Sequence, residues 1–426
     1  MKGEEILRDA KAALRLMLLL VLGFVSGCVT APETSVTPPL LLISLDGFRW
    51  DYFAKYPAET VNLRHLLAEG SSARELIPVF PSNTFPNHYT IVTGLYPAHH
   101  GVINNEMFDP GTQRFFRYNR ANSVRESEWW GGEPIWVTAI RQGHPAATSF
   151  WTGSEASIGG VHATFWKSYD PKIPFEKRLE ELLSWMRLPA EQRPVVVTFY
   201  LEETNSVGHK FGPDSKELAA TVKLLDGRVG TMLARLKAEG QVLNVVIVSD
   251  HGMTEISADR VTLLDDYLDL SSVQIDFSGP VVGLRPLEGT AESVVRALSA
   301  LPHARACLAR DLPERFHLVD NPRIPPVWIV PDEGWEIETR RYFETIRFKF
   351  NHGDHGYDPA LSSMHGILLA HGPSFKSGVA VDPVENIHIY NLLCAALRLT
   401  PARNDGDDRL VRAFLRVPAA PDLNRR

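Results

Sequence analysis

Three short apolar runs, each ending in a polar or acidic cluster, most constrain the fold of this 426-residue chain. They read LLLISLDG at 40–47, PVVVTFYLEE at 194–203 and LNVVIVSDHG at 243–252. Continuous runs of apolar and β-branched residues of this length are typical of parallel strands that are covered on both faces. Ligands of an open parallel sheet bind outside the carboxyl ends of its strands, so we expect the three polar clusters to meet at one edge.

Helical patterns lie between these runs, at 175–186 and at 215–240. The alternation of strands and helices predicts an α/β sandwich, with a central, mainly parallel sheet flanked by helices. From about 255 to 345 the pattern changes to shorter strands and one helix, which indicates a small inserted α+β lobe. We therefore expect one large domain, or two closely packed lobes, at 39–400, followed by a loosely held polar tail at 401–426.

The first residues, 1–27, have the composition of an export signal. Basic residues precede the apolar run MLLLVLGFV at 17–25, which is too short to span a bilayer comfortably. The run ends in VSGC, which resembles a bacterial lipoprotein cleavage site with Cys28 as the lipidated residue. The alternative is an incidental cysteine after an ordinary signal peptide. Val29 does not resemble the aspartate that retains such proteins at the inner membrane, so we expect an outer-membrane lipoprotein facing the periplasm, with 28–38 as a flexible tether.

The charge and the cysteines of the chain exclude some classes of protein. A formal net charge of −7 at pH 7, without long runs of one sign, gives no groove for duplex nucleic acid and no polybasic membrane patch. Beyond Cys28 the chain has only Cys307 and Cys394, too few for a disulfide scaffold. Cys394 lies in a helix-like apolar stretch and is expected in the core, but whether the two cysteines pair stays open. No obligate protein partner is evident.

Polar residues that suit a metal ion gather at the predicted strand ends. Carboxylate oxygen and imidazole nitrogen are ligands that zinc takes readily. Each residue alone has a simpler reading, because a single Asp after a strand is more often a turn or helix cap, and a single His is more often a surface group. The zinc hypothesis rests on their shared position at one edge of the sheet. The candidates are Asp46, Asn205, His209, Asp250, His251 and His355.

Thr84 stands in the turn-like stretch PSNTFPNHYT, between Pro81 and Pro86. Its hydroxyl could be a helix cap, a surface polar group or a nucleophile. A threonine hydroxyl becomes a nucleophile when a neighbouring base or metal ion activates it. The role of Thr84 therefore depends on the predicted metal site.

Longer stretches of the chain resemble the nucleotide pyrophosphatase/phosphodiesterase family of the alkaline phosphatase superfamily. They follow the family order from about 40 to 375 and read LISLDGFRWDY, PVFPSNTFPNHYTIVTGLYPAHHGVINNEMFDP, EPIWVTA, FWTGSE, YLEETNSVGHKFGP, VSDHGM and GDHGYD. The resemblance implies two zinc ions bridged by Thr84. The implied ligands are Asp46, Asp250 and His251 for one ion, and His209, His355 and the residue at position 205 for the other.

The same resemblance implies a mechanism and a nucleotide pocket. Thr84 would attack phosphorus in line and form a covalent phospho-threonine intermediate, which water then hydrolyses. Asn105, in GVINNEMF, matches a residue that grips a phosphate oxygen together with a backbone N–H near Thr84; its simpler reading is a turn asparagine. Phe85 and Tyr169 match positions that sandwich a nucleobase by stacking, although Tyr169 has the alternative of a rim residue without a ligand role.

One position departs from the family pattern. The family has aspartate at the start of a D-x-x-x-H pair, whereas this chain has Asn205 in TNSVGH. An amide oxygen can bind a metal ion but is neutral, so the second site should hold zinc more weakly, unless Glu202 or Glu203 takes its place. Both arrangements remain open at the level of sequence.

The leading hypothesis is a lipid-anchored, exported, zinc-dependent enzyme that splits nucleotide pyrophosphates or phosphodiesters and releases 5′-monophosphates. The alternatives within enzymology are a phosphomonoesterase and a choline-headgroup or lysophospholipid phosphodiesterase of the same superfamily. No sulfatase-like C-x-P-x-R surrounds Thr84, which disfavours sulfate esters. Asn205 leaves room for a third class, a catalytically weakened metal-binding lipoprotein.

Overall fold

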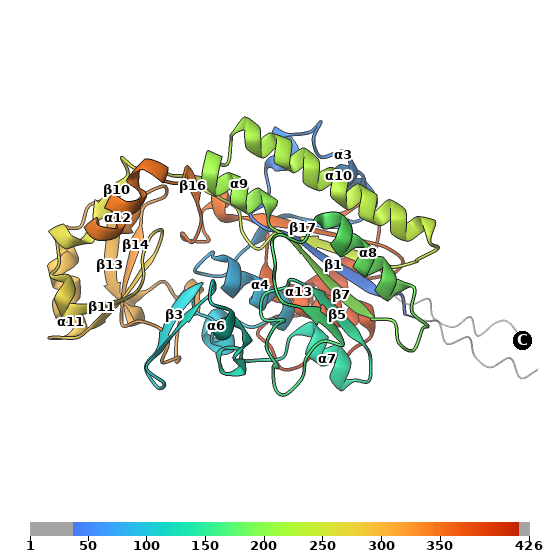
Figure 1. Ribbon diagram of the computed structural model, residues 1–426, viewed down its shortest axis with the longest axis horizontal. Helices are drawn as coiled ribbons and strands as arrows, with labels where there is room; N and C mark the ends of the chain where they lie inside the picture. The colour runs from blue at the N-terminus through green and yellow to red at the C-terminus, as the bar shows by residue number, and fades with distance from the viewer. Residues whose placement is uncertain (1–36, 417–426) are drawn as a thin grey trace, which may run out of the picture. The chain divides into compact units, whose positions relative to one another are not determined.

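The computed structural model describes residues 37–416, so the predicted signal peptide, Cys28 and most of the tether lie outside the described residues. The core of the described part is a nine-stranded sheet with helices on both faces (Figure 1). Its strands are β1 (Leu40–Leu45), β2 (Ser71–Ile77), β5 (Ala146–Ser149), β6 (Phe165–Lys167), β7 (Val196–Leu201), β8 (Asn244–Val248), β17 (Gly366–His371), β18 (Val379–Val381) and β19 (Val384–Glu385).

Most neighbouring strands of this sheet run parallel. Their order is β18-β2-β17-β8-β1-β7-β5-β6, with β19 beside β2. β1 is parallel to β7 and β8, and β5 is parallel to β6 and β7. β17 is the exception, because it runs antiparallel between β8 and β2. The predicted α/β fold with a mainly parallel sheet is confirmed, with one antiparallel strand that the sequence does not indicate.

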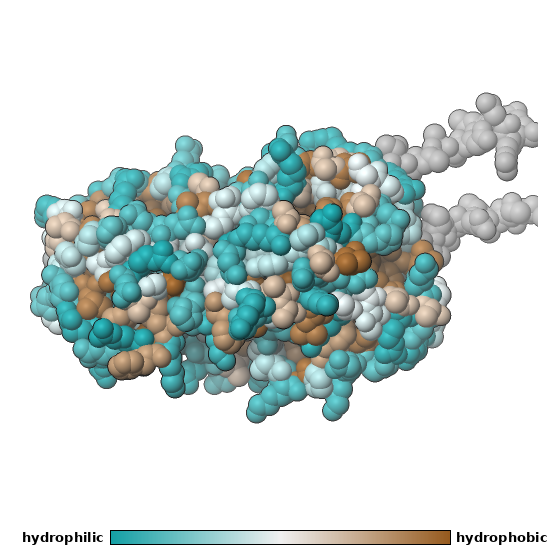
Figure 2. All heavy atoms as spheres, turned by 90° about the horizontal axis from the view of Figure 1, so that it is seen from above, coloured by the Kyte–Doolittle hydropathy of each residue, from teal (hydrophilic) through white to brown (hydrophobic). Residues whose placement is uncertain are grey.

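One face of the sheet is covered by α3 (Val61–Glu69), α8 (Phe175–Met186) and α10 (Lys216–Ala238). Leu41 and Ile43 of β1 point to this side and belong to the same buried cluster as the apolar residues of these helices. Successive side chains of a strand point to opposite faces, so every second residue of β1 serves this layer. Figure 2 shows hydrophilic residues interspersed with hydrophobic ones on the face that is seen from above.

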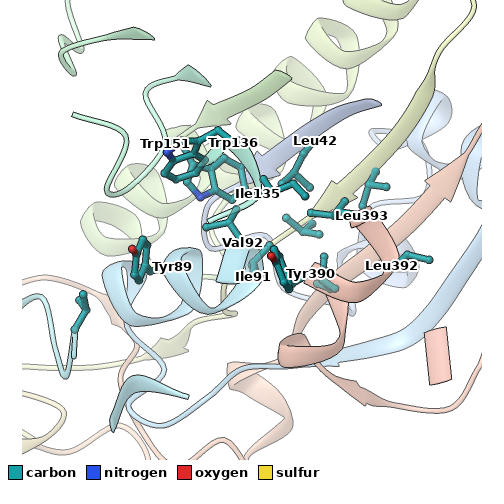
Figure 3. Close-up of a cluster of buried hydrophobic side chains, with 14 of the residues drawn as sticks. Leu42, Tyr89, Ile91, Val92, Ile135, Trp136, Trp151, Tyr390, Leu392 and Leu393 are labelled. Carbon is teal, nitrogen blue, oxygen red and sulfur yellow. The ribbon is translucent and has the colours of Figure 1, made fainter. Parts of the chain in front are cut away.

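The opposite face is covered by α4 (Thr84–Thr93), α7 (Ile135–Arg141) and α13 (Ile389–Leu397). Leu42 of β1 points to this side, where Figure 3 shows it near Trp136, among side chains from all three helices. The cluster is rich in large aromatic side chains, which bury the most apolar surface per residue. It forms the floor beneath α4, the helix that begins at Thr84.

A second, antiparallel sheet forms in the stretch where the sequence pattern changes. It has its own buried cluster, which includes Leu284 and Ile329 and is separate from the clusters of the main sheet. The chain returns to the main sheet through β16 (Gly353–Asp354). The elements of this lobe are β11 (Val273–Phe277), β12 (Val282–Pro286), α11 (Ala291–Ala297), β13 (Ala304–Leu308) and β14 (Val327–Pro331).

The expected loosely held tail is wrong for residues 401–416. These residues include α14 (Arg409–Phe414), in which Leu410 and Phe414 are buried. The main-chain N–H of Lys376 donates to Phe414 O at 2.7 Å and ties this helix to the segment before β18. Two apolar side chains in a polar stretch are enough to dock a short helix, and composition averaged over the segment hides them.

The two described cysteines are separate and buried. Cys394 lies in α13 with no exposed surface, as expected, and Cys307 lies in β13. Both are free thiols, so they do not pair with each other. Within residues 37–416, no helix is both long and apolar enough to cross a membrane.

Candidate active site

The parallel register brings three strand ends together at one edge of the sheet. Asp46 follows β1, and Asp250 follows β8, the neighbour of β1. β7, the other neighbour, leads into α9 (Glu203–Phe211), which carries Asn205. Gly47 has a φ of +66°, and a Cβ there would lie 3.1 Å from Asn205 Cα, so only glycine lets the two segments approach this closely.

Asp46, Asp250 and His251 form a first candidate metal group, and all three are buried. His251 Nε2 lies 3.0 Å from Asp250 Oδ2 and 3.4 Å from Asp46 Oδ1. His251 Nδ1 donates to Gly252 O at 2.8 Å, which leaves Nε2 facing the two carboxylates. Two carboxylates and an imidazole nitrogen are a donor set that suits zinc.

The charges of the first group are strongly coupled. Burial, followed by the charge of Asp250, raises the pKa of Asp46. Burial also opposes ionisation of Asp250, but His251 and His88 outweigh it and hold the pKa of Asp250 well below its usual range. Burial alone would lower the pKa of His251, whereas Asp250 and Asp46 raise it to about 9. The two carboxylates hold a proton on the His251 ring through their negative charge. A metal cation bound here would neutralise the same charge in place of that proton.

His209, Asp354 and His355 form a second candidate group, with ligand atoms within 4.8 Å of one another. His209 Nδ1 donates to Gly353 O at 2.8 Å, and His355 Nδ1 donates to Ser82 O at 3.0 Å. Both rings therefore keep a lone pair on Nε2. Burial, then the charges of His251 and His209, lower the pKa of His355 well below its usual range, which keeps that ring neutral and able to bind a metal.

Two buried oxygen atoms at this edge, Oδ1 of Asp46 and Oδ1 of Asn205, have no hydrogen-bond partner among the described residues. Buried polar atoms are almost always paired, because an unpaired one loses its hydration without compensation. Acceptors without donors, converging with imidazole nitrogens, fit a site built for cations.

Thr84 lies where the two groups meet. Its Oγ1 is 3.2 Å from His251 Nε2, and Thr84, Asp46, His209 and His355 line one cavity. The rings of His251 and His355 stack with centroids 3.5 Å apart, so the two groups are immediate neighbours. A hydroxyl between two candidate cation sites is placed to be activated as a nucleophile.

Asn105 is held by the first turn of α4. Its Oδ1 accepts the Phe85 main-chain N–H at 2.8 Å, so its NH₂ group is left to donate to a ligand. Asn105 lines the same cavity as Thr84. The Asn105 side chain, rather than a free backbone N–H of Phe85, is the donor that this arrangement offers to a phosphate oxygen.

The cavity has a volume of about 560 Å³, within the range of small-molecule sites, and Phe85 and Tyr169 both contribute to its wall. Phe85 also packs edge-on against Phe116 and Tyr118 with centroids 5.8 and 5.9 Å away. Tyr169 is 44% exposed and donates its hydroxyl to Glu202. The two predicted stacking residues therefore share one cavity.

The two glutamates next to Asn205 have other partners. Glu202 accepts the Tyr169 hydroxyl, and Glu203 pairs with Arg228 of α10. Neither belongs to a candidate metal group within residues 37–416. The carboxylate that groups with His209 and His355 is instead that of Asp354.

Residues 40–358 match the sequence model of a family described as type I phosphodiesterase / nucleotide pyrophosphatase. This match covers most of the chain and contains every residue of both candidate metal groups. The chain belongs to this family.

Venom phosphodiesterase of Macrovipera lebetinus is 38% identical over 408 residues, which are 92% of this chain and 47% of that protein. Human ectonucleotide pyrophosphatase/phosphodiesterase family member 1 is 38% identical over 400 residues, which are 91% of this chain and 43% of that protein. The chain thus spans about half the length of the curated relatives it matches.

Among solved structures, human ectonucleotide pyrophosphatase/phosphodiesterase 5 is similar with a TM-score of 0.83 and 34% identity. The match covers 88% of this chain and 99% of that one. The murine protein in an inactive form, in complex with AMP, gives the same TM-score and identity and covers 89% of this chain and 100% of that one. The α/β architecture of this chain is therefore that of the family.

Sequence reasoning missed three residues at this family site. Asp354 immediately precedes His355 in GDHGYD, so its position in the quoted motif was a usable signal. His88 lies one helical turn after Thr84, and its Nδ1 is 3.1 Å from Asp250 Oδ2. Tyr200, the first residue of YLEE, donates to Asp46 Oδ2 at 2.5 Å. These side chains sit behind the predicted ligands and hold them in place.

Proposed function

We propose that this protein is a zinc-dependent phosphodiesterase that hydrolyses nucleotide pyrophosphates and phosphodiesters and releases nucleoside 5′-monophosphates. The observation that carries the proposal is Thr84 Oγ1 at 3.2 Å from His251 Nε2, where two adjacent candidate metal groups meet. Membership of the type I phosphodiesterase / nucleotide pyrophosphatase family supports the reaction class. The murine relative in complex with AMP supports a nucleotide ligand.

Two zinc ions are proposed, one for each group. Asp46, Asp250 and His251 would hold the first, and His209 and His355, with Asn205 beside them, would hold the second. The donor chemistry fits, because carboxylate oxygen and neutral imidazole nitrogen are the common protein ligands of zinc. Bound zinc would neutralise phosphoryl oxygens and make the Thr84 hydroxyl easier to deprotonate.

In the proposed reaction, Thr84 Oγ1 loses its proton and forms a bond to phosphorus, while the bond from phosphorus to the leaving oxygen breaks. Asn105 would donate its NH₂ group to a non-bridging oxygen and hold the phosphoryl group against the first turn of α4. Water then cleaves the threonine–phosphate ester, which releases the 5′-monophosphate and restores the hydroxyl. An inactive threonine-to-alanine form of the murine relative supports an essential threonine in the family.

Phe85 and Tyr169 are proposed to hold the nucleobase between their rings. Both line the cavity, and aromatic stacking tolerates any base because every base has a π-face. The cavity would therefore accept several nucleotides rather than a single one.

We further propose that the protein is an exported lipoprotein anchored through Cys28 at the outer membrane. The support is the apolar run followed by VSGC in the sequence, and it lies outside the described residues.

The decisive experiment is a substrate panel after chelation and zinc titration. The panel compares a dinucleotide, a nucleoside triphosphate, a p-nitrophenyl nucleotide ester, a phosphomonoester and a lysophospholipid. We expect zinc-dependent release of 5′-monophosphate from the first three. Faster turnover of the phosphomonoester or of the lysophospholipid would replace the nucleotide assignment, and zinc binding without turnover of any compound would indicate a binding protein.

A further inference from the structure

The two candidate metal groups differ in charge. The first contains two carboxylates, Asp46 and Asp250. The second contains two imidazoles, His209 and His355, and a single carboxylate, Asp354. The neutral amide of Asn205 lines the same cavity as the two imidazoles. Imidazole and amide ligands give a dication no charge compensation, so a negative side chain close to the second group strengthens the binding of a cation there.

Asp354 is placed to supply this charge. It is the acid that groups with His209 and His355. Its Oδ1 lies 3.7 Å from His209 Nδ1 and accepts the main-chain N–H of His355 at 2.7 Å. The first contact sets the charge against the imidazole ring, and the second fixes the side chain in that orientation.

Asp354 lies behind His209 rather than in front of it. Because His209 Nδ1 donates to Gly353 O at 2.8 Å, the lone pair that can bind an ion is on Nε2, on the far side of the ring from Asp354. Gly353 O fixes the orientation of the ring, and the Asp354 carboxylate, 3.7 Å from Nδ1, raises the basicity of the ring through its charge. Gly353 makes this packing possible, because a Cβ there would lie 2.6 Å from Gly208 O of α9.

We propose that Asp354 supplies the negative charge of the second metal group, as a positioning residue that acts through His209 and offsets the neutral amide at position 205. The inference rests on the proposed zinc function of the same site. It differs from the arrangement in which Glu202 or Glu203 replaces the amide, because those two side chains are bound to Tyr169 and Arg228.

The test measures zinc affinity on the full chain by chelation, equilibrium dialysis against buffered zinc and metal analysis. Asp354→Asn should weaken one of the two bound ions by about 10-fold, because it removes one negative charge close to the ion while the hydrogen bond from His209 to Gly353 O stays in place. Asp358→Asn is the matched control, because it removes one negative charge from the same loop at similar exposure, 26% against 19%. Asp358 pairs with Arg315, so the control should bind both ions like the wild type.

A double variant separates charge supply from a structural role. Asn205→Asp should restore most of the lost zinc affinity when it is combined with Asp354→Asn, because it returns one negative charge to the same group. Two outcomes would overturn the inference: Asp354→Asn binds both ions as tightly as the wild type, or the double variant stays as weak as Asp354→Asn. If the wild type holds fewer than two zinc ions or turns over no nucleotide ester, the proposed function itself fails. If the wild type binds two zinc ions and is active, and Asp354→Asn binds both ions as tightly as the wild type, only the role of Asp354 is wrong.

Discussion

At the scale of single residues, Thr84 owes its chemistry to its place at the start of α4. The N-cap of this ten-residue helix is Asn83, so Thr84 is its first helical residue and not its cap. Helix N-termini stabilise nearby negative charge through their free N–H groups and the macrodipole. The hydroxyl points to His251 Nε2 instead of back to the helix. Its position favours an oxyanion or a bound phosphoryl group over a structural cap.

Removal of the Thr84 hydroxyl tests whether it is the attacking atom. Thr84→Ala should lower kcat by about four or more decades, as removal of other nucleophiles does, while zinc content stays at the wild-type value. Thr84→Ser is the control, because it keeps a hydroxyl and should retain a measurable part of the activity. Turnover of Thr84→Ala near the wild-type rate would mean that water attacks phosphorus directly.

Phe85 packs against its aromatic neighbours and also lines the cavity, and a mutation can show which of these two positions affects activity. Phe85→Ala should raise KM for a nucleotide diester, because the loss of one stacking partner removes about 1–3 kcal/mol of binding free energy. A small aryl phosphodiester without a base should keep its KM. Equal losses on both substrates would assign Phe85 to packing under the first turn of α4, where it contacts Phe116 and Tyr118.

At the scale of elements, the register between β1 and β7 fixes the first metal group. Tyr200 pairs with Ser44 in this register, and its hydroxyl reaches Asp46 just beyond the end of β1. A shift of one residue would turn Tyr200 to the other face of the sheet and remove this bond. The strand pairing therefore orients a predicted zinc ligand from behind.

Tyr200→Phe should weaken zinc binding at the first group by about 10- to 100-fold, with little change in packing, because only the hydroxyl is lost. Tyr89→Phe is the matched control, since the buried Tyr89 hydroxyl has no hydrogen-bond partner among the described residues. Its removal should leave zinc binding unchanged and should not lower the free energy of unfolding. Equal zinc titrations for the wild type and Tyr200→Phe would show that Asp46 needs no partner.

The packing of α5 (Pro97–His100) against α4 makes the fold sensitive to acid. His100 is buried, its Nδ1 accepts the Val102 N–H at 3.1 Å, and burial lowers its pKa to about 3. An unfolded histidine takes up a proton near pH 6.5, so between about pH 6.5 and 3 the unfolded state binds more protons. The free energy of unfolding should fall as pH falls through this window.

Denaturant unfolding at several pH values measures this effect. The stability advantage of the wild type over His100→Gln should shrink from pH 7 to pH 4. A constant difference between the wild type and His100→Gln would show that His100 does not titrate with unfolding.

The elements that the sequence predicts well are those with a clear local pattern, either a helical period or a continuous apolar run. The predicted helix at 175–186 coincides with α8, and the three apolar runs contain β1, β7 and β8. β17 is different, because the sequence analysis does not predict this strand, and its short run GILLAH does not indicate an antiparallel place between β8 and β2. Pairing partners are set by tertiary packing, which a local pattern does not contain.

At the scale of the whole molecule, the site depends on segments far apart in the chain. Asp46 and His355 are more than 300 positions apart in the sequence, and both line one cavity with Thr84. The sequence could predict this meeting because each residue sits in a motif or at a strand end. The motif GDHGYD contains Asp354, but the roles of Asp354 and His88 could not be predicted, because these roles depend on side-chain orientation across the fold. Contacts between side chains of neighbouring layers carry no sequence period.

The last prediction concerns attachment of the whole protein through Cys28, in the part of the chain that the structure does not describe. If Cys28 carries several acyl chains, the wild type should stay with the outer membrane after a salt wash and should incorporate labelled palmitate, because a single chain binds membranes only marginally. Cys28→Ser should lose the label and leave the outer-membrane fraction. Cys307→Ser is the control, since Cys307 is a buried free thiol and its exchange should leave both label and fraction unchanged. Val29→Asp should keep the label but move the protein to the inner membrane, which tests sorting apart from lipidation. Unlabelled wild-type protein, or Cys28→Ser still in the outer membrane after the wash, would replace the lipid anchor with an ordinary cleaved signal peptide.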